Sequence, residues 1–267
     1  MDLFANERQN KILELIKKSG AVTTSSLVGK FKVSIETIRR DLLHMEQMGY
    51  LSRVHGGAVE KSSINPFLNL EARNEEHSSQ KRELAKVATN FVLDGDIIAM
   101  DSGSTAIRFA EALKTKLKNL TVITHSLDVF NILNDIEGFS VILCGGDFLK
   151  NENAFYGYFT LNMLENLHIQ KAFICPSAIS LDGGIADFHK DLFGVQKQMI
   201  KSSDRIFILA DSSKFEKKGL LKLDDMRNDY CYITDSDLDP DMRKLYDENN
   251  ILIYTERDEC INDNTAK

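Results

Sequence analysis

Seven short apolar runs, separated by segments with helical periodicity, restrict this chain to few folds. The runs are residues 97–100, 120–124, 141–144, 172–175, 206–210, 231–234 and 251–254. Each is almost continuously hydrophobic, which is typical of a strand buried on both faces. Their alternation with helical patterns predicts an α/β domain built on a mostly parallel sheet. Ligands of such sheets bind beyond the carboxyl ends of the strands, so the residues that follow each run are site candidates.

Polar residues follow five of these runs. They lie at 101–105 (DSGST), 124–126 (THS), 144–147 (CGGD), 177–184 and 211–215 (DSSKF). Because parallel strands end at the same edge of a sheet, we expect the five segments to converge on one crevice.

The segment 101–105 has the composition of a phosphate-binding loop. Gly103 lets the backbone approach an anion, and the amide groups that open the next helix favour negative charge. Ser104 and Thr105 add hydroxyl donors that we expect at the phosphate; alternatively, one of them only caps the helix. Asp101 suits a phosphate poorly. We expect it to accept a hydrogen bond from a ligand hydroxyl or to orient the loop.

Two further strand ends can complete this crevice. Asp211 offers another acceptor for a hydroxyl, and Lys214 offers a cation that balances a phosphate. A lysine in this position can also be an ordinary surface residue. Gly145 and Gly146 either let a ligand lie against the backbone or form only a turn.

The first 60 residues show a different pattern, that of three helices followed by a hairpin. The first helical pattern begins at Glu7 and stops at Gly20, and a second short one ends near Phe31. A tight turn leads to a third helix, which Ser34 caps and which ends at Gly49. Two short helices joined by a brief turn predict a helix-turn-helix.

The third helix has an apolar and a polar side. The apolar side, which we expect in the core, consists of Ile35, Ile38, Leu42 and Met45. The opposite side consists of Glu36, Thr37, Arg40, His44 and Gln47, with Arg39 on its flank. Such a face suits a helix in the major groove, with Ser34, Arg39 and Arg40 on phosphates and short polar side chains at base edges. The alternative is an ordinary solvated face.

The segment after this helix adds a predicted wing. Strand-like residues flank Gly56-Gly57, which predicts a β-hairpin, and from it Arg53 and His55 can contact the DNA backbone or minor groove. Residues 1–60 carry a net charge of +2, whereas the rest of the chain carries −9. We therefore expect the N-terminal part to meet a polyanion.

These patterns predict a DNA-binding domain over residues 1–60, a linker over 61–74, and an effector-binding and oligomerisation domain over 75–267. The four cysteines show no CxxC or Cys/His spacing, so we expect no metal and no cofactor. No apolar run reaches the ~18 residues that a membrane span needs, and no segment looks like a signal peptide. We expect a cytoplasmic protein without membrane contact.

The string VSIETIRRDLLHMEQMGYLSRVHGGA resembles the N-terminal signature of DeoR-type bacterial transcriptional regulators. From about residue 75 to 255, DSGST, LCGGDF and ADSSKF match the effector domain of that family in order. The resemblance implies a winged helix-turn-helix that binds operator DNA. It also implies a sensor domain that is similar in fold to ribose-5-phosphate isomerase and commonly binds a phosphorylated sugar.

Carried over by position, the resemblance implicates as effector-binding residues Asp101, Gly103, Ser104, Thr105, Gly145, Gly146, Asp211 and Lys214. At His125 the sequence departs from the family, because THS replaces the more usual Thr-Asn-Ser. An imidazole, whose charge can vary near neutral pH, therefore stands in place of an amide, and we include His125 among the residues expected to contact the effector.

The isomerase likeness leaves one alternative, a sugar-phosphate isomerase-like enzyme with a fused DNA-binding head. Such an enzyme needs a carboxylate base and groups that stabilise an enediolate. Asp101, Asp182 and Asp211 are available carboxylates, but LDGGIAD resembles the isomerase segment Asp-Gly-Ala-Asp only loosely. A DNA architectural protein that binds no ligand leaves the polar strand ends unexplained.

A sensor, unlike an enzyme, has to hold its effector unchanged. We therefore expect a non-enzymatic repressor of a sugar-catabolism operon. It binds operator DNA as a homo-oligomer, a dimer or tetramer, and a phosphorylated sugar effector controls that binding.

Overall fold

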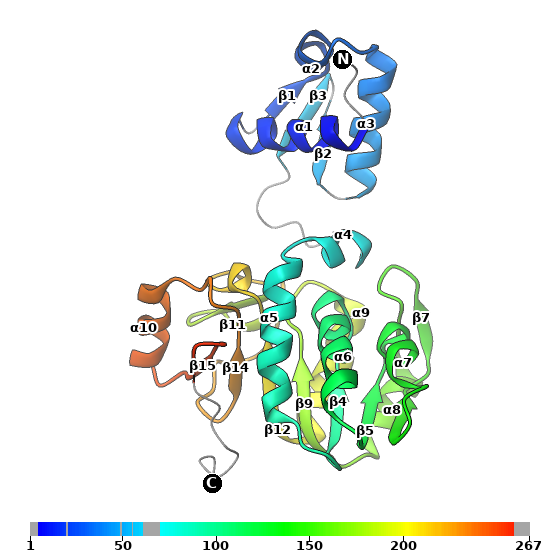
Figure 1. Cartoon of the computed structure of the whole chain (residues 1–267), viewed down its shortest axis with the longest axis vertical. Helices are drawn as coiled ribbons and strands as arrows, with labels where there is room; N and C mark the ends of the chain where they lie inside the picture. The colour runs from blue at the N-terminus through cyan, green and yellow to red at the C-terminus, as the bar shows by residue number, and fades with distance from the viewer. Residues whose placement is uncertain (1–4, 20, 49, 55, 61–69, 259–267) are drawn as a thin grey trace. The chain divides into compact units, whose positions relative to one another are not determined.

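The computed structural model describes residues 5–19, 21–48, 50–54, 56–60 and 70–258. The chain divides into two units, Met1–Arg73 and Asn74–Lys267, which we call the head and the body and describe separately (Figure 1). Residues 61–69, most of the predicted linker, lie outside the described residues, as does His55 of the predicted wing.

The head contains three helices and a three-stranded antiparallel sheet. Its elements are α1 (Ala5–Ser19), β1 (Ala21–Thr23), α2 (Thr24–Phe31), α3 (Ile35–Gln47), β2 (Leu51–Val54) and β3 (Gly57–Glu60). The predicted helix-turn-helix is α2 and α3, and the predicted hairpin is β2 and β3. β1, which the sequence pattern did not predict, pairs with β3. Gly56 turns the hairpin with a φ of +86°, whereas Gly57 already belongs to β3.

Local hydrogen bonds fix the two helices of the helix-turn-helix. Thr23 caps α2, because its Oγ1 accepts from the Ser26 amide at 3.2 Å. α2 ends at Lys32, whose φ of +53° is left-handed. Ser34 caps α3 as predicted, because its Oγ accepts from the Thr37 amide at 3.1 Å. Both helices therefore begin where the sequence offers a hydroxyl.

Residues of all three helices form the core of the head. Its buried members include Ile12, Ile16, Leu27, Ile38, Leu42 and Met45. The prediction that Ile35 faces this core is wrong, because its side chain is 50% exposed. Ile35 is the first residue of α3 and therefore lies beyond the end of the core instead of over it.

A buried ion pair joins α1 to α3 in the same core. Arg8 Nε donates to Asp41 Oδ2 at 2.6 Å, and both residues are less than one-tenth exposed. Gln9 Nε2 donates to Asp41 Oδ1 at 3.1 Å. Removal of Asp41 would leave the Arg8 guanidinium buried without the carboxylate of this pair.

The body is built on a seven-stranded parallel sheet. Its strands are β4 (Ile97–Met100), β5 (Leu120–Thr124), β6 (Phe139–Leu143), β9 (Ile169–Ile174), β12 (Ser203–Leu209), β14 (Cys231–Ile233) and β15 (Ile253–Tyr254). They lie in the order β15-β14-β12-β9-β4-β5-β6, and every neighbouring pair is parallel. All seven predicted runs overlap these strands, so the predicted α/β architecture is confirmed.

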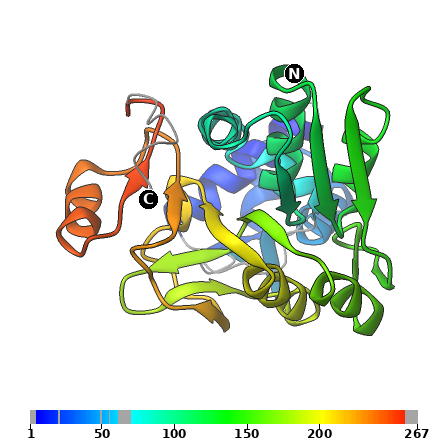
Figure 2. The same ribbon diagram turned by 90° about the horizontal axis from the view of Figure 1, so that it is seen from below.

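Helices cover both faces of the sheet. One face is covered by α5 (Ser78–Ala88), α6 (Ser104–Lys116) and α7 (Leu127–Leu133), and the other by α8 (Tyr158–Glu165) and α9 (Lys190–Lys201). Figure 2 shows the two layers on opposite sides. Along β4, Ile98 and Met100 pack into the core on the side of α5, α6 and α7. Ala99 packs into the core on the side of α8 and α9. This burial on both faces explains why the strand sequences are continuously apolar.

Short antiparallel strands follow the carboxyl ends of β6, β9 and β12. β7 (Asp147–Leu149) pairs with β8 (Ala154–Tyr156), and β10 (Ala178–Ser180), β11 (Gly184–Asp187) and β13 (Leu221–Asp224) form a separate sheet. The remaining elements are α4 (Leu70–Glu75), the 3-10 helices η1 (Thr89–Phe91) and η2 (Ser212–Lys214), and α10 (Pro240–Glu248). The sequence pattern predicted none of the five short strands.

Candidate functional site

The outer side of α3 carries the residues predicted to contact DNA. Its exposed members are Glu36, Arg39, Arg40 and His44. Thr37 is half-buried, because its hydroxyl lies 2.8 Å from the capping hydroxyl of Ser34. The Arg39 guanidinium lies 3.8 Å from the Glu36 carboxylate. Because this ion pair is exposed, it does not hold either side chain firmly. Both arginines can therefore turn toward an external anion.

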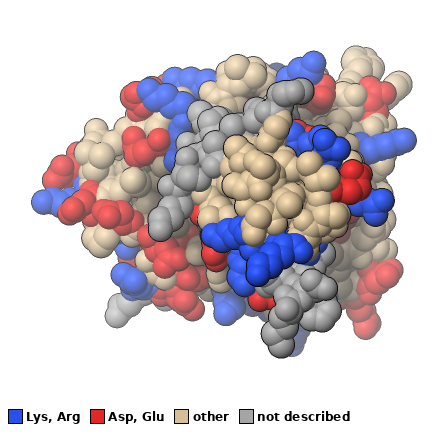
Figure 3. All heavy atoms as spheres, turned by 90° about the horizontal axis from the view of Figure 1, so that it is seen from above, with Lys and Arg blue, Asp and Glu red and all other residues tan. Residues whose placement is uncertain are grey.

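The wing is tied to α3 by one carboxylate. The backbone amide of Arg53 donates to Glu46 Oε1 at 2.8 Å. The side-chain Nη1 of Arg53 lies 3.8 Å from Glu46 Oε2. Lys30 and Lys32, at the end of α2, are exposed as well. Figure 3 shows Lys and Arg side chains gathered on the surface of the head that is seen from above. The predicted contact of His55 lies outside the described residues.

In the body, Asp101 is the centre of a buried hydrogen-bond network at the carboxyl edge of the sheet. Its Oδ1 accepts from the Ser102 amide at 2.8 Å and lies 3.2 Å from His125 Nε2. Its Oδ2 accepts from the Cys175 amide at 3.0 Å and from Gln196 Nε2 at 2.9 Å. Three N–H donors and the His125 ring, which donates when Nε2 carries hydrogen, surround the acceptor sites of this carboxylate. Of the two roles predicted for Asp101, orienting the loop fits this geometry and binding a ligand hydroxyl does not.

His125 belongs to the same network and is 1% exposed. Its Nδ1 lies 2.9 Å from the carbonyl oxygen of Phe155, and its Nε2 faces Asp101. Both partners accept, so both contacts are hydrogen bonds when both ring nitrogens carry hydrogen. The imidazole thus bridges the end of β5 to β8. Its geometry gives no support to the predicted contact with a ligand.

Residues that the sequence did not single out complete the network. Gln196 Nε2 donates to Asp187 Oδ2 at 3.1 Å as well as to Asp101. Asp187 Oδ1 accepts from Ser177 Oγ at 3.0 Å. Burial, followed by the charges of Asp101 and Asp187, raises the pKa of the Cys175 thiol well above its usual range. We call Asp101, His125, Asp187 and Gln196 the Asp101 network.

The start of α6 has the geometry of an anion-binding helix N-terminus. Gly103 precedes the helix with a φ of +96°, which residues with a side chain resist. Ser104 and Thr105 are the first helical residues, and no side-chain hydrogen bond caps this end. The alternative that one of them caps the helix is therefore wrong. The amides of the first turn have no acceptor within the helix.

The two glycines after β6 differ in their surroundings. A Cβ at Gly146 would lie 2.4 Å from the Tyr156 carbonyl oxygen and 2.3 Å from Thr160 Oγ1, so packing against β8 and α8 requires glycine there. A Cβ at Gly145 would meet no atom within 4 Å. The predicted approach of a ligand to the backbone is therefore sterically open at Gly145, whereas Gly146 has a structural role.

The carboxyl end of β12 supplies Asp211 and Lys214. Asp211 Oδ1 accepts from the amide of Ser213 at 3.1 Å and also from the Ser213 hydroxyl. The Asp211 side chain thereby caps η2. Within the described part of the chain, Asp211 Oδ2 is buried and has no hydrogen-bond partner. Lys214 is half-buried at the end of η2. Asp211 thus keeps the acceptor capacity that Asp101 has already used.

Asp182, which the sequence grouped with these residues, does not join them. Its carboxylate pairs with Lys218 Nζ, and the two side chains are 65% and 66% exposed. The hydrogen bond between them lowers the pKa of Asp182 and raises that of Lys218. Asp182 is therefore an ordinary surface carboxylate.

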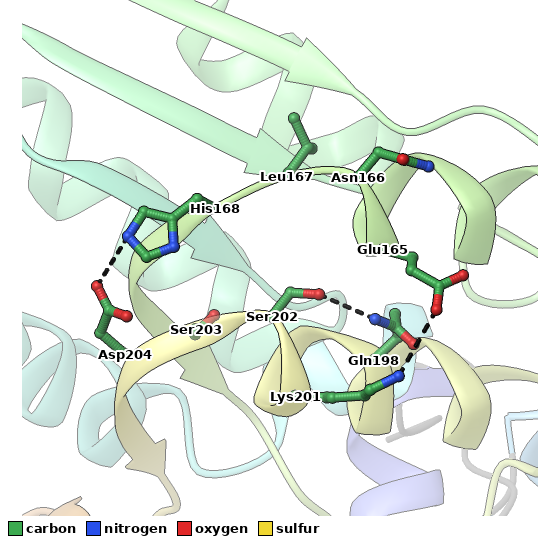
Figure 4. Close-up of a pocket in the computed structure, with 9 residues that line it drawn as sticks. All are labelled: Glu165, Asn166, Leu167, His168, Gln198, Lys201, Ser202, Ser203 and Asp204. Atoms are coloured by element: carbon green, nitrogen blue, oxygen red, sulfur yellow. Dashed lines mark hydrogen bonds and ion pairs between the residues drawn. The ribbon is translucent and has the colours of Figure 1, made fainter.

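The opposite edge of the sheet carries a separate hollow. Figure 4 shows this hollow, of about 520 Å³, at the amino ends of β9 and β12. Its lining consists of Glu165, Asn166, Leu167, His168, Gln198, Lys201, Ser202, Ser203 and Asp204. His168 pairs with Asp204 and Lys201 with Glu165, and all four side chains are more than half exposed. Water weakens the attraction within such exposed ion pairs. Ligands of parallel sheets bind at the carboxyl edge, which is the edge opposite this hollow.

Comparison with known proteins identifies the two units. Residues 8–63 match the DeoR-like helix-turn-helix domain, and residues 76–236 match the DeoR C terminal sensor domain. The chain belongs to the DeoR family of transcriptional regulators. The head of this DeoR-family regulator is thus its DNA-binding domain, and the body is its sensor domain.

Similar proteins cover almost the whole chain. The HTH-type transcriptional regulator IolR of Bacillus subtilis is 29% identical over 92% of this chain and 98% of its own length. The lactose phosphotransferase system repressor of Lactococcus lactis is 32% identical over 87% and 92%. The L-fucose operon activator of Haemophilus influenzae is 29% identical over 92% and 98%. These relatives include both a repressor and an activator.

Solved structures resemble this chain only remotely. Ribose 5 phosphate isomerase A from Neisseria gonorrhoeae is 20% identical, with a TM-score of 0.36 over 52% of this chain and 54% of that one. At this low sequence identity and TM-score, the likeness says nothing about the activity of this chain. No helix in the described part of this DeoR-family chain is long and apolar enough to cross a membrane.

Proposed function

We propose that this regulator represses a sugar-catabolism operon in the cytoplasm and that a phosphorylated sugar controls its binding to operator DNA. The observation that carries the proposal is the start of α6, which no side-chain hydrogen bond caps and where the amides of Ser104 and Thr105 have no acceptor within the helix. Such a helix end favours a phosphate through its oriented amides and its dipole.

The other residues of the carboxyl edge have complementary roles. Lys214 supplies the cation that balances the phosphate, and Gly145 leaves room for a ligand against the backbone. Asp211 accepts a hydrogen bond from a ligand hydroxyl through Oδ2, whose burial without a partner is otherwise unfavourable. Asp101 holds the loop that contains Gly103 in place.

Binding without turnover is supported by the state of the carboxylates. An isomerase requires a base with a lone pair directed at the carbon that loses its proton. Three N–H donors and the His125 ring surround the acceptor sites of Asp101, and Asp182 lies on the surface with Lys218. Of the three carboxylates on which the alternative enzyme assignment drew, Asp211 alone keeps an unpartnered buried oxygen, and we assign that oxygen to a ligand hydroxyl and the body no reaction.

The head contacts the operator through α3 and the wing. Ser34, Arg39 and Arg40 bind phosphates, Glu36, Thr37 and His44 contact base edges, and Arg53 and His55 contact DNA from the wing. Residues 1–60 form the DNA-binding domain, 61–74 the linker and 75–267 the effector-binding and oligomerisation domain. Because one small head gives limited affinity, the protein binds paired half-sites as a dimer or tetramer.

The proposal is tested with the full chain and the DNA upstream of its own operon. In a mobility-shift assay, Lys214→Ala should retain DNA binding but lose its response to a panel of sugar phosphates. Lys218→Ala, which removes the same charge four residues later from an exposed pair, is the matched control and should respond normally. An undiminished response in Lys214→Ala would place the phosphate elsewhere.

A further inference from the structure

Gln196 lies on α9 between two buried carboxylates. Its Nε2 is 2.9 Å from Asp101 Oδ2 and 3.1 Å from Asp187 Oδ2. These contacts fix the orientation of the amide, because the reverse orientation would direct the carbonyl oxygen at two carboxylate oxygens. The side-chain oxygen Oε1 therefore points away from both carboxylates, and within the described residues it is buried without a partner.

Among the described residues, the unpartnered buried oxygens at the carboxyl edge include Gln196 Oε1 and Asp211 Oδ2, in side chains that are 3% and 1% exposed. The sheet brings their surroundings together. β9 and β12 pair in register up to Ile174 and Ile208, and Ser177 and Asp211 each lie three residues further on. Ser177 donates to Asp187, which also holds Gln196.

The charge of this region is predominantly negative. Asp101, Asp187 and Asp211 are all buried, and His125 faces Asp101. Lys81 of α5 is buried as well, and its positive charge opposes the rise in the pKa of Cys175. A ligand group that enters here gains by donating hydrogen bonds and loses by carrying a negative charge.

We propose that Gln196 and Asp211 together select phosphorylated ligands whose remaining groups are neutral hydroxyl donors, and reject ligands that carry a second acid. This inference rests on the proposed function, since it concerns the end of the effector away from the phosphate. Both oxygens are shielded from water, so a ligand donor has to displace the atoms that cover them. Asp101 and Asp187 are positioning residues that orient the Gln196 amide.

The test uses three matched pairs of probes and the full chain. Each pair joins a sugar phosphate to the acid obtained by oxidising its aldehyde carbon: erythrose 4-phosphate and 4-phosphoerythronate, ribose 5-phosphate and 5-phosphoribonate, glucose 6-phosphate and 6-phosphogluconate. Calorimetry should find at least one sugar phosphate that binds, and its acid should bind at least about tenfold more weakly. An acid that binds as tightly as its sugar overturns the selection while the proposed function stands. If the chain binds none of the six probes, both the proposed selection and the proposed function are overturned.

Variants separate selection from folding. Asp211→Asn keeps the shape and Oδ1 but removes the charge, so the preference for sugar over acid should shrink by about tenfold. Asp182→Asn, the matched change at the exposed carboxylate, should leave that preference unaltered. Gln196→Met should weaken the bound sugar phosphate by about tenfold and leave the affinity for inorganic phosphate unchanged. An equal loss for both ligands would show that Gln196 only supports the fold, and an unaltered preference in Asp211→Asn would overturn its role.

Discussion

The head and the body expose their functional side chains in opposite ways. On α3 of the head, the candidate DNA contacts Glu36, Arg39, Arg40 and His44 are exposed and share few bonds with the rest of the protein. At the carboxyl edge of the body, Asp101, His125 and Asp211 are almost fully buried. A change on α3 should therefore alter one contact, whereas a change at the carboxyl edge should also disturb the fold.

This difference follows from what each unit has to bind. DNA is a large polyanion that accepts flexible, solvated cations, and its phosphates lie outside the protein. A small effector can be distinguished only when water is excluded and donors and acceptors are fixed in advance. The site in the body therefore consists of buried polar groups, each of which is unfavourable unless it is hydrogen-bonded.

The largest effect is expected for Asp101→Ala. The change removes the acceptor of two backbone amides, Gln196 and His125, and leaves these groups buried. The free energy of unfolding of the body should fall by about 3–5 kcal/mol. Urea unfolding followed by circular dichroism measures this, since the chain has no tryptophan.

Asp182→Ala is the control for that experiment, because its carboxylate is exposed and paired only at the surface. It should unfold like the unaltered chain. If Asp101→Ala also unfolded at the unaltered urea concentration, the network would not contribute to stability and the contrast between the units would fail.

A smaller but similar effect is expected in the head for Asp41→Ala. Arg8 would remain buried without its 2.6 Å partner, so the head should lose about 3 kcal/mol of stability. The unfolding transition that moves should be that of the head and not that of the body. Glu36→Ala, which removes an exposed partner of Arg39, should change the stability by less than about 0.5 kcal/mol.

The sequence predicts the sheet well because each parallel strand is buried on both faces and is therefore continuously apolar. β1 (AVT) and β10 (AIS) each hold two apolar residues followed by a polar one, and this pattern did not reveal them as strands. Ile35 shows a second limit, since helical spacing gives the direction of a side chain but not where the core ends.

Within the site, Asp101 and Asp211 are visible in the sequence because each directly follows a strand. Gln196 is not, because its partner Asp101 is 95 residues away and no local spacing joins them. The one available signal is its position beside Val195 and close to Leu192 and Met199 on the buried side of α9. A glutamine on a buried helix face requires hydrogen-bond partners from elsewhere in the fold.

Arg40→Ala tests the other half of the comparison. The loss of one phosphate contact should weaken operator binding by about tenfold and lower the slope of log K against log salt by about one. The stability of the head should not change, because Arg40 is exposed. Arg82→Ala removes another exposed arginine, from α5, and should alter neither the affinity nor the slope. Equal losses in the two variants would point to net charge and not to a contact made by α3.

The smallest effect is expected for Ile35→Ala at the start of α3. Its side chain is 50% exposed, so its truncation should change the stability of the head by less than about 0.5 kcal/mol. Ile38→Ala, three residues on and fully buried, should lower it by about 2–4 kcal/mol. An exposed apolar side chain at the N-terminal end of a helix in the major groove can contact the methyl group of thymine. Ile35→Ala should therefore alter the operator preference at a single base pair, which a binding selection on randomised operators measures. If Ile35→Ala instead destabilised the head as much as Ile38→Ala, the exposed face of α3 would begin later than the structure places it.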